Sequence, residues 1–105
     1  MVGVVHAFPS QLQEAAMNLT ERLTQYGMTE REDGTLMIPF ENRSGFVQVH
    51  VRAGRVWMRD LLADGRSAPG EFGEWRSQRS QLVSWLLHRD TPLADWLRAR
   101  GASVK

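Results

Sequence analysis

The sequence predicts an α+β domain with an N-terminal helix, a four-stranded antiparallel meander and two C-terminal helices. Three observations predict this order. Apolar residues recur at helical spacing over 10–26, they alternate with polar residues over 28–61 between three turn signals, and helical spacing returns over 72–97. A chain of 105 residues has the usual size of one domain, so residues 1–105 are expected to share a single core.

The first helix is expected over 10–26. Ser10 and Gln13 have the spacing of a capping box, and Leu19 and Leu23 belong to an apolar stripe that repeats every three or four residues. Gly27 follows as the residue type that best adopts a left-handed helix cap. The pattern therefore predicts one amphipathic helix with one buried stripe.

Three turn signals separate the expected strands at 28–32, 35–40, 46–52 and 55–61. They are Asp33-Gly34, which favours a type I′ turn, the tetrad at 42–45, and Ala53-Gly54. These loops place all the apolar partners on one face: Phe40 with Val47, Ile38 with Val49, Leu36 with Val51, Val51 with Val56, and Val49 with Met58. Pro39 lacks an N–H group, which predicts either a bulge or a first strand too short to reach it.

A loop containing glycine and proline over 63–73 leads to a second helix, expected over about 72–88. Thr91 before Pro92 predicts the start of a third helix, which Gly101 ends. Trp85 lies off the apolar line of the second helix, so we expect it to contact a partner or a second copy. The alternative is that the two C-terminal helices pack together and bury it.

The composition excludes several kinds of chemistry. Without cysteine the chain has no disulfide, iron-sulfur cluster, thiolate zinc site or cysteine nucleophile. No segment has the roughly 18 apolar residues of a membrane span, and the N-terminus lacks the pattern of a signal peptide, so a cytoplasmic location is expected. His6, His50 and His88 lack ligand spacing, and no phosphate-binding motif is present. We therefore predict no metal, cofactor or catalytic residue, and no enzyme activity.

The most unusual group in the sequence lies on the outward face of the predicted sheet. The register that buries the valines turns His50, Arg52, Arg55, Trp57 and Arg59 outward, with Arg52 directly across from Arg55. Aromatic and arginine side chains interleaved on a sheet are also used to bind single-stranded nucleic acid. Two alternatives compete with a binding surface. Glu30 and Glu32 neutralise the arginines, or the C-terminal helices cover Trp57, with His50 and Met37 beside it, as a second small core.

Charge is unevenly distributed although the net charge is only +1. Residues 1–41 carry two arginines against six acidic residues, whereas 42–105 carry eleven basic residues against six acidic ones.

The element order is similar in outline to the secretion-chaperone type of α+β domain, which implies binding to segments of another protein. We predict a small non-enzymatic protein-binding domain of adaptor, chaperone or inhibitor type. It is expected to form a homodimer and to use the outward sheet face or the C-terminal helices. The alternative is a nucleic-acid-binding protein.

Overall fold

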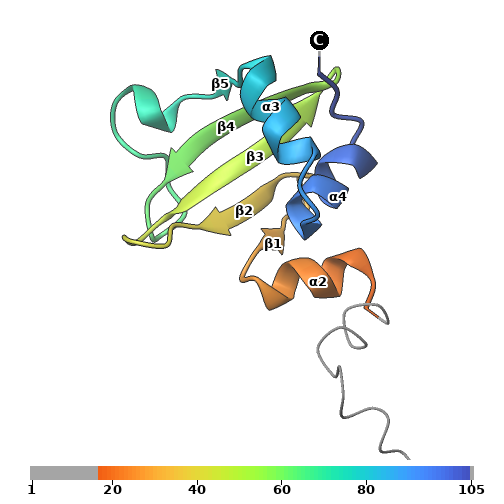
Figure 1. Ribbon diagram of the computed structural model, residues 1–105. Helices are drawn as coiled ribbons and strands as arrows, with labels where there is room; N and C mark the ends of the chain where they lie inside the picture. Colours follow the sequence, from red (N-terminus) through yellow and green to blue (C-terminus); the bar gives the residue numbers. More distant parts are fainter. Residues whose placement is uncertain (1–16, 105) are drawn as a thin grey trace, which may run out of the picture.

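A five-stranded antiparallel sheet with α-helices against one face forms the protein (Figure 1), as seen in a computed structural model that describes residues 17–104. The elements are α2 (Leu19–Gln25), β1 (Thr29–Glu30), β2 (Leu36–Pro39), β3 (Phe46–Arg52), β4 (Arg55–Leu61), the 3₁₀ turn η2 (Glu71–Gly73), β5 (Arg76–Ser77), α3 (Ser80–Leu87) and α4 (Pro92–Ala99). The strands lie side by side in chain order. The α+β prediction is confirmed, with β5 as one strand more than the four expected.

Helix α2 starts later than the helix expected over 10–26. Its N-cap is Asn18, whose backbone is extended with ψ 173°. The Asn18 side chain accepts a hydrogen bond from the N–H of Glu21 at 2.8 Å, and the Glu21 carboxylate accepts one from the N–H of Asn18 at 3.2 Å. This capping box interrupts the helical backbone, so a continuous helix through Asn18 is wrong. The expected start at Ser10 and Gln13 lies outside the described residues.

The turn between β1 and β2 differs from the expected two-residue type I′ turn. Gly34 has a positive φ of 86° but Asp33 does not, whereas a type I′ turn requires positive φ at both. The Asp33 carboxylate instead accepts hydrogen bonds from the N–H and the hydroxyl of Thr35, at 2.9 and 2.6 Å. Strand β1 pairs with Leu36 and Met37 and does not reach Pro39, which confirms the expectation of a short first strand.

The pairing of β2 with β3 is shifted by two residues from the expected register. Leu36 pairs with Val49, and the N–H of Phe40 donates to the carbonyl of Gly45 at 3.1 Å, so the four-residue loop is 41–44. Gly45 has φ 105°, and a Cβ atom there would overlap the carbonyl oxygen of Leu61. Gly45 therefore closes the loop just before β3 and lies against the backbone of β4. A shift of two keeps every side chain on its expected face.

The hairpin of β3 and β4 matches the prediction. Val51 pairs with Val56 across the two-residue turn. Ala53 and Gly54 both have positive φ, 52° and 80°, as a type I′ turn requires.

The helix expected over 72–88 is wrong for its first half. Helix α3 begins only at Ser80, and β5 pairs with β4 before it. The N–H of Gln78 donates to the carbonyl of Val56 at 2.8 Å, so the edge of β4 holds this segment extended. Gly73 lies so close to the backbone of Ala68 that a Cβ atom would overlap it. The edge of the sheet thus replaces the local helical pattern.

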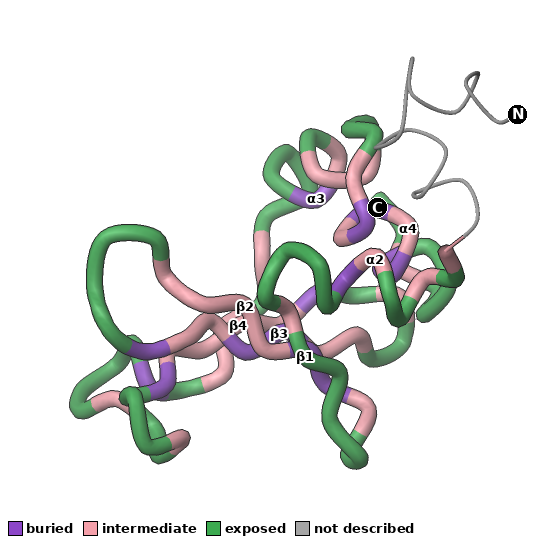
Figure 2. Tube along the Cα trace, turned by 90° about the horizontal axis from the view of Figure 1, so that it is seen from below, coloured by how far each residue is buried: buried purple, intermediate pink, exposed green. Residues whose placement is uncertain are grey.

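Helix α4 begins as predicted, because the Thr91 side chain accepts a hydrogen bond from the N–H of Ala94 at 3.1 Å and Pro92 follows Thr91. Its buried residues join the core, which consists of Leu23, Leu36, Val49, Val56, Val83, Trp96 and Leu97. Figure 2 shows α2, α3 and α4 on the same side of the strands. The core is therefore the layer between these helices and one face of the sheet.

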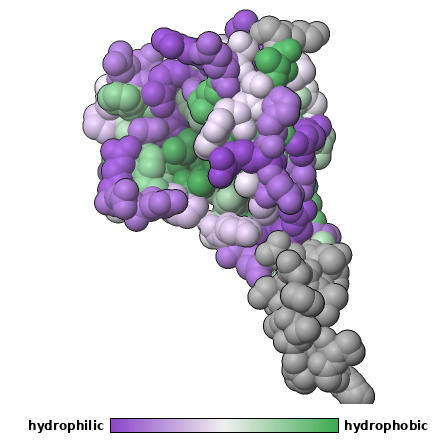
Figure 3. Space-filling view, viewed as in Figure 1, coloured by the Kyte–Doolittle hydropathy of each residue, from purple (hydrophilic) through white to green (hydrophobic). Residues whose placement is uncertain are grey.

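The helices leave part of this sheet face uncovered. Figure 3, which views the helix side, shows hydrophobic residues in the middle of a largely hydrophilic surface. Ile38, Val47 and Met58 are partly buried apolar residues of this face that pack against the core.

Candidate functional site

Five of the six predicted site residues lie together on the sheet face opposite the helices, which we call the open face. His50 pairs with Trp57, and Arg52 pairs with Arg55, as expected. Arg59 follows on β4, two residues beyond Trp57. The type I′ turn at 53–54 sets these pairs, because it fixes the register of both strands.

A buried polar chain occupies the centre of the open face. Arg59 Nε donates to Gln48 Oε1 at 2.7 Å, Gln48 Nε2 donates to the Thr35 hydroxyl at 2.9 Å, and that hydroxyl donates to Asp33. Gln48 is 3% exposed and Thr35 is 5% exposed. Buried polar groups are stable when each finds a partner, so this chain fixes the position of Arg59. Alternation along β3 from His50 predicts Gln48 on this face, but no sequence pattern predicts its hydrogen bonds.

The hydrogen bonds of this chain also affect Asp33. The pKa of the Asp33 carboxyl is lowered from its ordinary value, chiefly by the hydroxyl of Thr35, then by the N–H of Thr35 and by the charge of nearby Arg31. Both Thr35 groups donate to the ionised form and therefore favour it.

Trp75 also belongs to the open face, although its sequence pattern did not predict this position. It directly precedes β5, and its ring lies 5.7 Å from that of His50. The guanidinium of Arg59 lies 4.6 Å from the centre of the Trp75 ring, within the range of a cation–π contact. A small cluster around His50 therefore exists, as one of the alternatives expected. It is formed by Trp75, which precedes β5, and not by the C-terminal helices. The polar run at 76–79, which lacks a helical stripe, was the available signal.

Arg52 and Arg55 stand exposed at the end of this face. Neither has a carboxylate within 4.0 Å among residues 17–104. The expectation that Glu30 neutralises these arginines is wrong. Glu30 pairs with Leu36 and therefore lies on the sheet face that the helices cover, where it forms an ion pair with Arg100. The strand expected over 28–32 ends at Glu30, so Glu32 is not paired in the sheet and does not lie in line with Arg52 and Arg55 as expected.

Trp85 lies on the other layer of the protein. It is 56% exposed on α3, and the guanidinium of Arg89 lies 4.4 Å from its ring centre. Leu82, one turn earlier, is 37% exposed. The alternative in which the C-terminal helices bury Trp85 is therefore wrong, and the six predicted residues form two separate surfaces.

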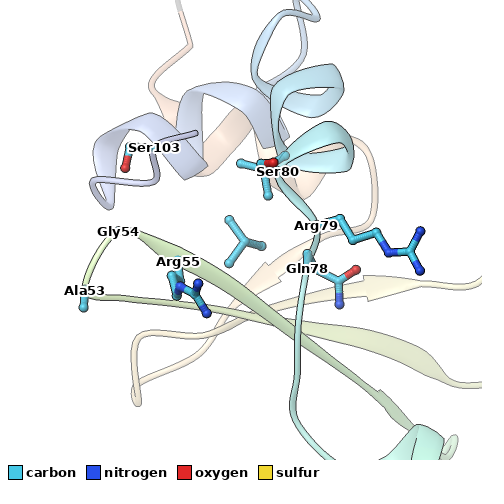
Figure 4. Close-up of a pocket in the computed structure, with 9 residues that line it drawn as sticks. Ala53, Gly54, Arg55, Gln78, Arg79, Ser80 and Ser103 are labelled. Atoms are coloured by element: carbon cyan, nitrogen blue, oxygen red, sulfur yellow. The ribbon is translucent and has the colours of Figure 1, made fainter. Parts of the chain in front are cut away.

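A cavity of about 400 Å³ lies where the open face meets the helical layer, at the end of the β3–β4 hairpin (Figure 4). It is lined by Ala53, Gly54, Arg55, Val56, Gln78, Arg79, Ser80, Val83 and Ser103. In Figure 4 Ser80 and Ser103 lie on the helical side and Arg55 on the strand side, whereas Arg79 extends away. No acidic residue lines the cavity.

Residues that bear other chemistry are dispersed or already paired. His50 and Asp60 lie on opposite faces of the sheet, and Asp60 forms ion pairs with Arg43 and Arg76. Over residues 17–104 no group of three or more His, Asp or Glu side chains is placed to hold a metal ion. The helices of the same region are all too short or too polar to cross a membrane.

Comparison with known proteins adds no assignment. No protein-family model matches the sequence, and no curated protein and no solved structure is significantly similar to it.

Proposed function

We propose that this protein is a small non-enzymatic binding domain, of adaptor, chaperone or inhibitor type, that holds another protein on its open face. The observation that supports the proposal is the half-buried pair of indoles, Trp57 and Trp75, set among arginines. Trp and Arg are enriched among residues that dominate binding energy at protein interfaces. Arg59 is already hydrogen-bonded to Gln48, so the Arg59 side chain loses little conformational entropy when a partner binds.

Affinity capture from the native lysate tests this proposal with a matched pair of variants. Trp57→Ala removes an indole from the open face, and Trp85→Ala removes an indole from the other layer. We expect Trp57→Ala to lose a protein that both the unmodified protein and Trp85→Ala retain. Retention of the same protein by Trp57→Ala contradicts the proposal, as does the absence of any partner. Arg55→Glu, an exposed change, repeats the test if Trp57→Ala is poorly folded.

Single-stranded nucleic acid is the second candidate ligand, because Arg52 and Arg55 have no acidic partner in the described chain. It ranks second because the net charge is only +1. Two phosphate contacts on a single strand predict a slope of about −1.4 in log affinity against log salt, or roughly a sevenfold loss between 50 and 200 mM salt. Fluorescence anisotropy with a labelled oligonucleotide measures this slope. Binding that is unchanged in Arg55→Glu removes this candidate.

Self-association is proposed for the other layer. Leu82 and Trp85 form an exposed apolar pair on α3, which is the kind of patch that a second copy covers. Sedimentation velocity is expected to show a dimer that becomes a monomer in Trp85→Ala and persists in Trp57→Ala. A monomer at all concentrations contradicts the proposal.

A cytoplasmic location is also part of the proposed function, because the lack of cysteine fits a reducing compartment.

A further inference from the structure

The cavity at the end of the β3–β4 hairpin has the size of a small-ligand pocket, at about 400 Å³. Its floor is apolar, since Val56 and Val83 are 1% and 3% exposed. Its walls come from three separate segments. Gly54 belongs to the hairpin turn, Ser80 is the first residue of α3, and the N–H of Ser103 donates to the carbonyl of Gly54 at 3.0 Å. The pocket is therefore held by backbone contacts and not by mobile side chains alone.

The charge at the cavity is positive and lacks a counterion within the described chain. Arg55 lines the cavity and Arg52 lies directly across from it on β3. Like charges in facing positions of two strands are unfavourable, and an anion between them removes the repulsion. Among residues 17–104 the guanidinium of Arg55 makes a single hydrogen bond, a long one of 3.4 Å to the hydroxyl of Ser77. Most of its five N–H donors are therefore available to a ligand.

We propose that this cavity binds an anionic oxygen group, a carboxylate or a phosphate. Arg55 is its main contact, because a guanidinium matches the two oxygens of either group. Arg52 is not among the lining residues, and it contributes positive charge from across the strand pair. The hydroxyls of Ser80 and Ser103 can each donate a hydrogen bond to the same group. Arg79 is excluded from this role since it extends away from the cavity in Figure 4. Trp57 and Trp75 are not among the lining residues, so the site meets the open face only at Arg55.

Titration of the ¹⁵N-labelled protein with three small probes at constant ionic strength tests the site. Butyrate and phosphate carry the anion, and butyramide has the shape of butyrate without the charge. We expect butyrate or phosphate to shift the amide signals of Gly54, Arg55, Ser80 and Ser103 with a dissociation constant in the millimolar range, about 1–10 mM. The tighter of the two identifies the source of the anion. Equal shifts with butyramide overturn the proposal, as do no shifts up to about 50 mM of either anion.

Three variants with the same change of charge separate contact from general electrostatics. Arg55→Gln is expected to weaken binding of the better anion at least tenfold, because it removes a direct contact. Arg52→Gln removes only a neighbouring charge and should weaken binding by no more than about threefold. Arg79→Gln removes one positive charge nearby without removing a contact, so its affinity should stay within about twofold of the unmodified protein. An equal loss in Arg79→Gln and Arg55→Gln overturns the proposal. These readouts use no protein partner, and Trp57→Ala tests the open face without changing a lining residue of the cavity, so failure of one proposal is distinguishable from failure of the other.

Discussion

Replacing Arg52 by glutamate is expected to stabilise the fold, although it removes a predicted binding residue. Arg52 faces Arg55 across the strand pair, and neither has an acidic partner in the described chain. Removing an unfavourable facing pair and adding a favourable one each contribute roughly 0.2–1 kcal/mol. The two contributions sum to roughly 0.4–2 kcal/mol. Both side chains are exposed, which keeps the sum in the lower part of that range, at about 0.4–1 kcal/mol in low salt.

Urea denaturation of the Arg52→Glu variant in low and high salt measures this effect. The gain should appear at about 20 mM salt and largely disappear at about 1 M, where the Debye length falls to about 3 Å. Arg52→Gln removes the repulsion without adding an attraction and should give about half the gain. A variant that is less stable than the unmodified protein in low salt would refute the reasoning. So would a gain that survives high salt, because it would then arise from packing.

Three further changes test the fold. Gly45→Ala should cost about 2 kcal/mol or more in urea denaturation, because alanine is strained at φ 105° and its Cβ atom would overlap the carbonyl of Leu61. Leu97→Ala should lower the free energy of unfolding by about 2–5 kcal/mol and the melting temperature with it, since Leu97 is fully buried in the core. Asp33→Ala should destabilise the protein at pH 7 but much less at about pH 2.5. The lowered pKa of Asp33 contributes stability above its unfolded value near 3.9, and this contribution is lost as the pH falls through the folded pKa. An equal cost of Asp33→Ala at both pH values would exclude this account.

The sequence predicted those parts of the fold in which local signals decide the structure. Thr91 and Pro92 started α4, and Ala53 with Gly54 set the β3–β4 hairpin. It failed where distant backbone decides. Gly45 resembles a turn residue in sequence, but the residue directly follows the loop at 41–44 and lies against the carbonyl of Leu61 on β4. The stretch at 72–79 was expected to be helical, but its hydrogen bonds go to the edge of β4.

The candidate site was predictable to a similar extent. Alternation along two strands placed His50 and Trp57 on one face, because the two-residue turn at 53–54 fixes the register of β3 and β4 as predicted. Trp75 was missed since its position depends on β5, a strand of two residues with no periodicity to detect. The cavity was also missed, because its walls meet only through contacts between residues far apart in sequence.

The edges of the sheet leave little backbone to which another strand can attach. The outer strands β1 and β5 have two residues each, and the end of β2 that β1 leaves uncovered contains Pro39, which has no N–H to offer. Beside β5, the carbonyls of Val56 and Asp60 already accept hydrogen bonds from the N–H groups of Gln78 and Ala68. Strand-by-strand growth into fibrils or swapped sheets is thereby hindered at both sides. If the proposed protein partner binds here, it is expected to do so through side chains, with selectivity from shape and charge instead of generic main-chain pairing.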